Sequence, residues 1–369
     1  MSWVLTILGI VSLIVLHELG HFLAAKSVGM RVERFSLFFP PTIAKVRSGE
    51  TEYAIGAIPA GGYVKITGMN PEELRDTDLR IAVRSYFMKP PWRRIFVIAA
   101  GPAVNLLIAF LLFAIVAMSG TAGGASTLER LDPARTLTKP TPEVAAVIPG
   151  LPADRVLREG DLILKIDGVK ATVSGTERAI TADTCSGPLR NGCRGARAVD
   201  MLVRRHGRDV QIRVRPVYDA EVGRMLVGFD FGYRGIALSP AAAAGASAGV
   251  MWNATAETVS GIAKALTSAK ERKQLSSIVG ITTVTQQAVA AGWGRALAVI
   301  GYVSLVLGVV NLFPFLPLDG GHIVWSLAEK LRGKRVSIAA MWRYSSVGLI
   351  LLAFLVISGL SNDISRLGG

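Results

Sequence analysis

The pentapeptide His17-Glu18-Leu19-Gly20-His21 lies inside an apolar stretch that begins at Trp3 and is long enough to cross a bilayer as a helix. Residues i and i+4 share one face of an α-helix, so both histidines can direct a ring nitrogen at one metal ion. Glu18 is the next position along, within reach of a water at that ion. This HExxH pattern is typical of zinc hydrolases in which the glutamate is the general base. Because ionisable side chains at membrane depth are costly, their presence here indicates a function.

The composition is that of a membrane protein with an additional polar part. Hydrophobic residues make up 51% of the 369 positions and charged residues 18%, so the charges must be concentrated in particular segments. The formal net charge is +14. The basic residues flank apolar stretches and do not alternate with aromatic ones, which excludes a nucleic-acid-binding pattern. We therefore expect membrane lipid as a partner and no nucleic acid; the sequence leaves the oligomeric state open.

Four apolar stretches have the length of a membrane span, at about residues 3–25, 95–118, 296–317 and 344–360. Lys and Arg follow the first stretch, begin the second and separate the third from the fourth. Since short cytoplasmic loops are rich in these residues, we predict a multi-pass protein of the inner (plasma) membrane with its N-terminus outside the cytoplasm. Residues 236–256 are uncharged but less apolar. We interpret them as an interfacial helix, membrane insertion being the alternative.

A second polar cluster ends the third stretch, in the run NLFPFLPLDGGH from Asn311 to His322. Pro314 and Pro317 cannot continue a regular helix, which predicts unwound backbone there. The third span runs inward and brings this cluster to the same, cytoplasmic side of the membrane as the two histidines. Catalytic zinc usually takes three protein ligands and keeps a fourth position open. The spacing leaves Asp319 and His322 as alternatives for the third ligand.

The order of HELGH, then Gly101-Pro102-Ala103-Val104-Asn105, then NLFPFLPLDGGH resembles the site-2 protease family of intramembrane zinc metalloproteases. The resemblance covers nearly the whole chain and is closest to bacterial members with a single PDZ domain, of the regulator of sigma-E protease type. It implies a bound Zn²⁺ with His17, His21 and Asp319 as its ligands. It also implies Glu18 as the catalytic base and Asn311 as a catalytic or substrate-binding residue.

The activity implied by this resemblance is endopeptidase cleavage within the membrane, in regulated intramembrane proteolysis. The implied substrates are single-span membrane proteins: anti-sigma factors, other regulators and remnant signal peptides. The alternative is a catalytically inactive, membrane-anchored PDZ scaffold. Glu18 disfavours the scaffold, because a purely structural zinc site has no use for a base.

Two β-prone runs between Glu52 and Ile66 flank the segment Pro59-Ala60-Gly61-Gly62, referred to below as the Pro-Gly-Gly segment, which predicts a β-hairpin with its turn there. The hairpin belongs to the first cytoplasmic loop. It is either solvent-exposed or, as the resemblance implies, a membrane-associated element that pairs with unwound substrate by strand addition. In the second case Gly61 and Gly62 bind substrate by permitting close approach of its backbone.

The stretch from Val144 to Gly168 resembles a PDZ domain through Pro152-Ala153, Gly160-Asp161 and Ile166-Asp167-Gly168. Alternating residues in 201–205 and 210–214 predict a β-hairpin that completes it. The topology places this insert outside the cytoplasm, where disulfides can form. Cys185 and Cys193 flank a turn-rich loop, so the alternatives are a disulfide or two free thiols.

The predicted fold is an α-helical polytopic membrane protein with four transmembrane helices, a cytoplasmic-side β-hairpin and an inserted α+β PDZ domain. Residues 1–120 are predicted to form the first half of a membrane protease core, and residues 295–369 the second half. Between them we predict an extracytoplasmic PDZ domain at 121–235 and extracytoplasmic or interfacial linker helices at 236–294. The active site is predicted to lie towards the cytoplasmic side.

Overall fold

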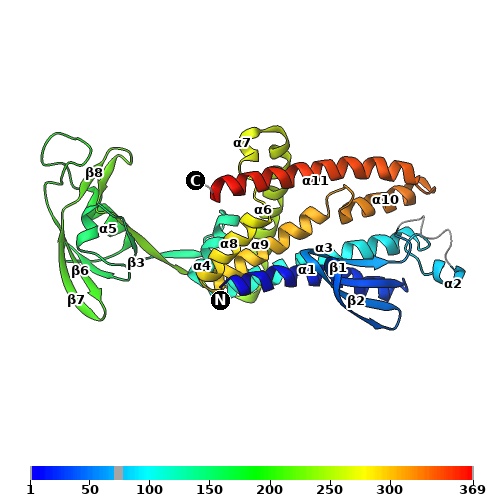
Figure 1. The fold of residues 1–369 in the computed structure, drawn as a ribbon. Helices are drawn as coiled ribbons and strands as arrows, with labels where there is room; N and C mark the ends of the chain where they lie inside the picture. Colours follow the sequence, from blue (N-terminus) through cyan, green and yellow to red (C-terminus); the bar gives the residue numbers. More distant parts are fainter. Residues whose placement is uncertain (1, 70–77, 368–369) are drawn as a thin grey trace. The chain divides into compact units, whose positions relative to one another are not determined.

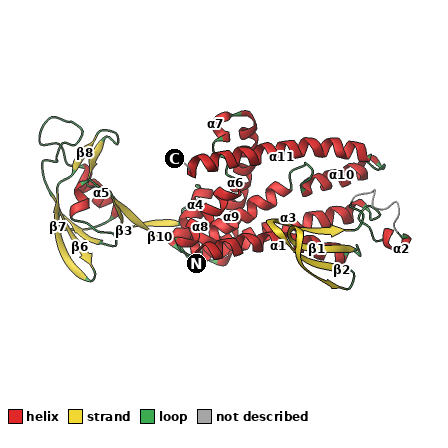
Figure 2. Cartoon of the chain, in the orientation of Figure 1, coloured by secondary structure: helices red, strands yellow, loops and turns green. Residues whose placement is uncertain are grey.

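The computed structural model describes residues 2–69 and 78–367. Their contacts divide into two compact units, and each is described here by itself. The helical unit comprises the described residues within Met1–Ser119, Thr127–Arg135 and Leu238–Gly369, and the β-rich unit comprises Gly120–Ser126 and Thr136–Ala237. Figure 1 labels the elements, and Figure 2 shows helices prevailing in the first unit and strands in the second.

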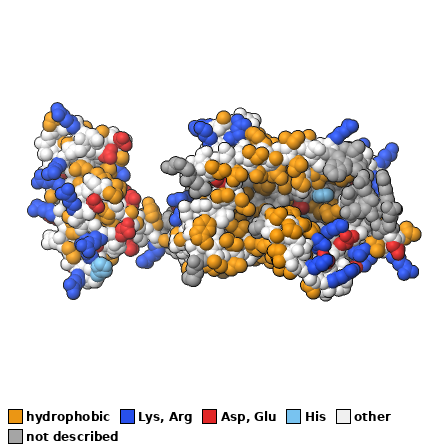
Figure 3. All heavy atoms as spheres, in the orientation of Figure 1, with side chains coloured by type: hydrophobic (Ala, Val, Ile, Leu, Met, Phe, Trp, Pro, Cys, Tyr) orange, Lys and Arg blue, Asp and Glu red, His pale blue; other side chains and the backbone are white. Residues whose placement is uncertain are grey.

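Among the described residues, four helices are long and apolar enough to cross a membrane. They are α1 (Ser2–Ser27), α3 (Pro91–Ser119), α9 (Trp293–Asn311) and the segment Arg343–Arg366 of α11 (Ile338–Leu367). The four predicted spans are thereby confirmed as apolar helices of sufficient length. Hydrophobic side chains cover much of the face of the helical unit seen in Figure 3.

Small residues allow these helices to approach closely, and α3 packs against both α1 and α9. A Cβ atom built on Gly20 of α1 would lie 2.7 Å from the backbone oxygen of Ala100. On α9, a Cβ atom at Gly301 would lie 2.8 Å from the ring of Phe113. Glycine at these positions lets the helix backbones come together, as in other membrane bundles. Helix α3 thus contacts both of the helices that lead to the polar clusters found in the sequence.

The stretch 236–256 falls mainly within α6 (Pro240–Thr267), which packs against α3 and α9. Ser239 caps its first turn by accepting a hydrogen bond from the backbone of Ala242. The helix is not among the four candidate spans. The predicted helix is confirmed, and its interfacial position stays a prediction. Further helices are α2 (Leu79–Ala82), α4 (Ala122–Leu131), α7 (Ala269–Arg272), α8 (Ile278–Ala290) and α10 (Asp319–Arg332).

A two-stranded sheet of β1 (Val32–Ser48) and β2 (Thr51–Ile66) follows α1. Its turn lies at Gly49 and Glu50, so the turn predicted at Pro-Gly-Gly is wrong. Gly49 has φ of +61°, a left-handed conformation that reverses the chain. The Pro-Gly-Gly segment instead lies within β2, where glycines let the strand curl over β1. Leu37 is accordingly paired with both Ile55 and Gly62.

The β-rich unit contains a sheet with the order β10-β3-β4-β6-β7, to which β5 adds beside β4. The strands are β3 (Thr138–Val147), β4 (Leu162–Ile166), β5 (Val169–Lys170), β6 (Val199–Arg205), β7 (Arg208–Val214) and β10 (Phe229–Gly235). A separate pair is formed by β8 (Val217–Asp219) and β9 (Arg224–Leu226), and the helix is α5 (Val173–Thr181). The core includes Ile163, Met201 and Val203, all nearly inaccessible to solvent. The hairpin predicted at 201–205 and 210–214 is confirmed as β6–β7.

Of the two alternatives for the cysteines, the structure has the disulfide between Cys185 and Cys193. Backbone hydrogen bonds join this loop to β8. The N–H of Gly192 donates to the oxygen of Tyr218 (2.7 Å), and the N–H of Tyr218 donates to the oxygen of Cys193 (2.9 Å). The unit is of α+β type, and its assignment as a PDZ domain stays a prediction.

Candidate metal centre

His17 and His21 lie one turn apart on the face of α1 that is turned into the helical unit, and each is 7% exposed. Their Nε2 atoms are 3.2 Å apart. Asp319 is the first residue of α10. Its Oδ2 atom lies 3.3 Å from Nε2 of His17 and 3.2 Å from Nε2 of His21. The fold thus brings together two residues of the first span and one residue beyond the third.

The three donor atoms fit a metal ion. Nδ1 of His21 lies 2.9 Å from the backbone oxygen of Val97, so Nδ1 carries the proton and Nε2 presents its lone pair. The Oδ2 atom of Asp319 is buried and has no hydrogen-bond partner in the described structure. Ligand atoms of the three residues all lie within 4.8 Å of one another. Two imidazole nitrogens and a carboxylate oxygen are a donor set suited to zinc, and a cation relieves the burial of an unpaired carboxylate.

Helix α3 forms the wall behind His21. A Cβ atom at Gly101 would lie 2.2 Å from Nε2 of that histidine, so only glycine leaves room for the ring in its present place. One turn further along, Asn105 is fully buried, and neither polar atom of its amide has a partner in the described structure. Its backbone oxygen accepts a hydrogen bond from Oγ of Ser304 at 2.8 Å. Helix α3 therefore supports the site without supplying a metal ligand.

Glu18 lies between the candidate ligands and the β1–β2 sheet. Its carboxylate accepts a hydrogen bond from the backbone N–H of Val64 on β2. A Cβ atom at Gly62 would lie 3.1 Å from Cγ of Glu18 and 3.0 Å from the backbone oxygen of Ser36. Gly62 thus allows the strand to lie directly against the candidate base.

The backbone between Leu312 and Leu318 is not helical, as the two prolines predicted. A Cβ atom at Gly320 would lie 2.2 Å from the backbone oxygens of both Leu312 and Phe313, so this segment folds tightly onto the start of α10. The tight fold directs Asp319 to the histidines. His322 lies one turn further, with its ring 6.2 Å from the ring of Tyr86, and is not part of the cluster.

Asn311 is the last residue of α9 and is partly buried. Its catalytic or substrate-binding role stays a prediction. Sequence reasoning missed the contribution of the backbone groups at Val64 and Val97, because a peptide group carries no sequence signal. It also missed the buried ion pair of Arg94 and Glu329, because the basic residues at the start of the second apolar stretch indicated only the direction of that span. The signal that could have indicated this pair is the position of Arg94, a charged residue within the apolar helix α3.

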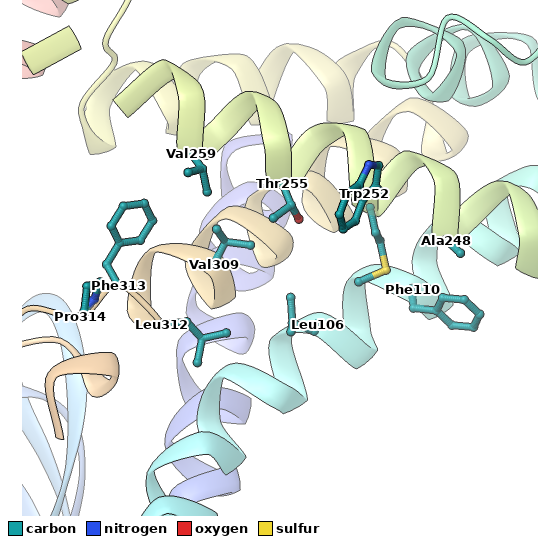
Figure 4. A pocket seen from close by; sticks show the side chains of 11 residues that line it. Leu106, Phe110, Ala248, Trp252, Thr255, Val259, Val309, Leu312, Phe313 and Pro314 are labelled. Atoms are coloured by element: carbon teal, nitrogen blue, oxygen red, sulfur yellow. The ribbon is translucent and has the colours of Figure 1, made fainter. Parts of the chain in front are cut away.

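An apolar groove of about 670 Å³ lies between α3, α6 and α9 (Figure 4). Leu106 and Val309 line it, and Phe313 and Pro314 form the end nearest the segment that leads to Asp319. Among the described residues, no Asp, Glu, His, Cys, Lys or Arg side chain lines the groove. Apart from the hydroxyl of Thr255 and the indole of Trp252 it offers apolar contact, and the chemistry belongs to the histidine–aspartate cluster.

The comparisons with known proteins agree with this geometry. The family model of peptidase family M50 matches residues 5–355. A Clostridium perfringens protein whose name contains the words zinc metalloprotease is 31% identical over 368 residues, covering 98% of each chain. The zinc metalloprotease Rip1 of Mycobacterium tuberculosis is 29% identical over 354 residues, covering 89% of this chain and 86% of its own. The chain therefore belongs to peptidase family M50, the site-2 protease family of zinc metalloproteases.

Proposed function

We propose that this protein is an intramembrane zinc endopeptidase with His17, His21 and Asp319 as the zinc ligands and Glu18 as the base. The observation that carries the proposal is the convergence of the three donor atoms within 4.8 Å of one another, beside Glu18, whose side chain lies against Gly62 of β2. Bound zinc would supply positive charge that polarises the scissile carbonyl and favours ionisation of water. The other steps of the reaction, proton transfer and stabilisation of the developing negative charge, are carried out by side chains of the protein.

Glu18 accepts a proton from the attacking water and passes it to the leaving amine, the usual work of a general base that becomes a general acid. Its carboxylate lies beside the backbone N–H of Val64 on β2, which lowers the cost of carrying its charge there. Asn311 donates a hydrogen bond to the carbonyl oxygen as negative charge develops on it. These roles require an extended substrate backbone, since the peptide groups of a helix are engaged in internal hydrogen bonds.

Strand β2 is suited to hold that extended backbone. It contacts Glu18 directly, and Gly61 and Gly62 present backbone without side chains. Strand addition would then supply main-chain hydrogen bonds to unwound substrate next to the base. The apolar spans support single-span membrane proteins as substrates, in regulated intramembrane proteolysis: anti-sigma factors, other regulators and remnant signal peptides.

We place the protein in the inner membrane with its N-terminus and β-rich unit outside the cytoplasm, following the distribution of basic residues. The β-rich unit acts as a PDZ domain that binds or screens the external part of a substrate. A cavity of about 610 Å³ between α5, β9 and β10 supports this, with Ile180, Met225 and Phe229 among its lining residues. β10 is an edge strand of its sheet, so it can accept an extended peptide.

Cleavage of a panel of tagged single-span proteins by the purified chain in detergent tests the proposal. Wild type and Glu18→Gln are compared, and bound zinc is measured in both. Cleavage by wild type, together with an inactive variant that retains zinc, supports the protease. Equal cleavage by both proteins would contradict the role of Glu18. Zinc-free wild-type protein would favour the inactive scaffold.

A further inference from the structure

A buried ion pair joins α3 to α10 on the helical unit. An Nη2 atom of Arg94 contacts Oε2 of Glu329, and both side chains are only 6% exposed. The other carboxylate oxygen of Glu329 accepts a hydrogen bond from the backbone N–H of Val336 at 3.3 Å. The guanidinium also lies over the rings of Tyr86 (5.8 Å) and Phe87 (5.5 Å). Arg94 and Glu329 therefore hold fixed positions.

The two helices that this pair joins are the ones that position opposite sides of the metal centre. On α3, Val97 lies three residues after Arg94 and fixes the ring of His21 through its backbone oxygen. On α10, Asp319 is the first residue, and Glu329 follows about 15 Å further along the helix axis. Arg94 thus joins the C-terminal end of α10, the helix that carries Asp319, to α3, the helix whose Val97 fixes the ring of His21.

The near end of α10 is fixed separately. Gly320 packs onto the backbone of Leu312, and a Cβ atom at Gly321 would lie 2.6 Å from the backbone nitrogen of Leu316. A helix held at one end can still tilt about that end. Such a tilt moves Asp319 little, because this residue lies beside the pivot, but it changes the direction in which its carboxylate points. A contact at Glu329, far from the pivot, restricts the tilt and so fixes that direction.

A role in folding alone explains the pair less well. Replacing a buried ion pair by apolar residues of similar volume is often neutral or stabilising, so fold stability gives little reason to keep it. The position of a metal ligand, in contrast, can depend on such a pair even where the stability of the fold does not. Substituting groups that hydrogen-bond directly to metal ligands typically changes metal affinity about 10- to 100-fold. Arg94 and Glu329 act through α10 and not by such a bond, so we expect the lower end of this interval.

We propose that Arg94 and Glu329 are positioning residues that set the Asp319 carboxylate at bonding distance from a metal held by His17 and His21. The proposal rests on the proposed function, in which these three residues bind zinc. Neither Arg94 nor Glu329 touches the metal or the substrate. Their effect passes through the orientation of α10 relative to α3.

The test is Co²⁺ titration of the purified, metal-free full chain in detergent, read by the visible absorption of the bound ion. Arg94→Met and Glu329→Gln are expected to weaken Co²⁺ affinity about 10-fold and to alter the spectrum. The matched control is Asp363→Asn. Asp363 is 2% exposed and accepts hydrogen bonds from Ser277, but it joins α11 to α8 and not α3 to α10. Its variant is expected to keep the wild-type spectrum and affinity.

If the single variants fail to fold, the Co²⁺ titration is made with the double variant Arg94→Met with Glu329→Leu. This variant leaves no unpaired buried charge and is therefore expected to fold. Weakened Co²⁺ binding by this folded double variant supports the proposal. Wild-type affinity and spectrum in any folded variant of the pair would overturn it, as would an equal loss in the control. A wild-type chain that binds no Co²⁺ would instead contradict the proposed function, so the two failures are distinguishable.

Discussion

Gly101→Ala is expected to displace the ring of His21 and weaken zinc binding. The added Cβ atom would lie 2.2 Å from Nε2 and 2.6 Å from Cε1 of the ring. Ordinary contacts begin near 3.4 Å, so Nε2 must move by about 1.2 Å. Metal–ligand distances tolerate only about 0.2 Å. The hydrogen bond to Val97 resists rotation of the ring, so the displacement falls on the coordinating nitrogen.

We expect zinc affinity to fall about 10- to 100-fold in Gly101→Ala, equivalent to roughly 1.4–2.8 kcal/mol. Competition between the protein and a fluorescent chelator measures this in detergent. Gly245→Ala is the control, because it makes the same substitution within a helix where nothing lies within 4 Å of the added atom. The reasoning about the site would be refuted by Gly101→Ala protein that binds zinc as tightly as wild type.

Three further outcomes are expected. Gly62→Val crowds Glu18 and is predicted to abolish substrate cleavage while bound zinc stays at the wild-type level; unimpaired cleavage would contradict the contact. Replacing both Cys185 and Cys193 by Ser opens a loop with a sequence separation of 8 and should cost the β-rich unit about 2.5 kcal/mol. Hydrogen exchange of the intact chain measures this, and unchanged protection of β8 would count against it. Asp161→Asn breaks a partly buried pair with Arg205 (2.6 Å). It should lower the stability of the same unit by about 2 kcal/mol and so raise its hydrogen exchange. Unchanged exchange there would refute the importance of the pair.

The Asp161 pair also predicts the direction of a pH effect. Burial raises the pKa of Asp161, but the hydrogen bonds and charge of Arg205 outweigh it and leave the pKa below its ordinary value of 3.8. A lowered folded-state pKa means that the pair contributes fully above pH 3.8. Protection of the β-rich unit against exchange should therefore decline as the pH falls below 3.8. Protection that rises over that interval would contradict the assignment.

Much of the site was predictable because it depends on local periodicity. The i, i+4 spacing of His17 and His21 places them together on any helix, and hydropathy alone identifies the four spans. The choice between Asp319 and His322 was not accessible from spacing. It depends on the path of the unwound segment after Asn311, which tertiary packing determines and the sequence does not encode in any simple pattern.

The β1–β2 sheet shows a second limit. Pro-Gly-Gly is a strong turn signal, yet the chain turns at Gly49 and keeps Gly61 and Gly62 within a curled strand. Glycine signals conformational freedom but does not say whether a turn, a curl or a close approach uses it. At Gly62 the glycine permits a close approach of β2 to Glu18, and this contact depends on tertiary packing.

The claim that His17, His21 and Asp319 bind zinc is tested most directly by X-ray absorption at the zinc edge of the purified full chain. We expect a shell of two imidazole nitrogens at about 2.0–2.1 Å with oxygen ligands at about 2.0–2.2 Å and no sulfur. Asp319→Ala should lose one oxygen from this shell or lose the metal. The claim would be contradicted by a shell that contains sulfur or only one imidazole. It would also be contradicted if the shell of the Asp319→Ala variant were the same as that of wild type.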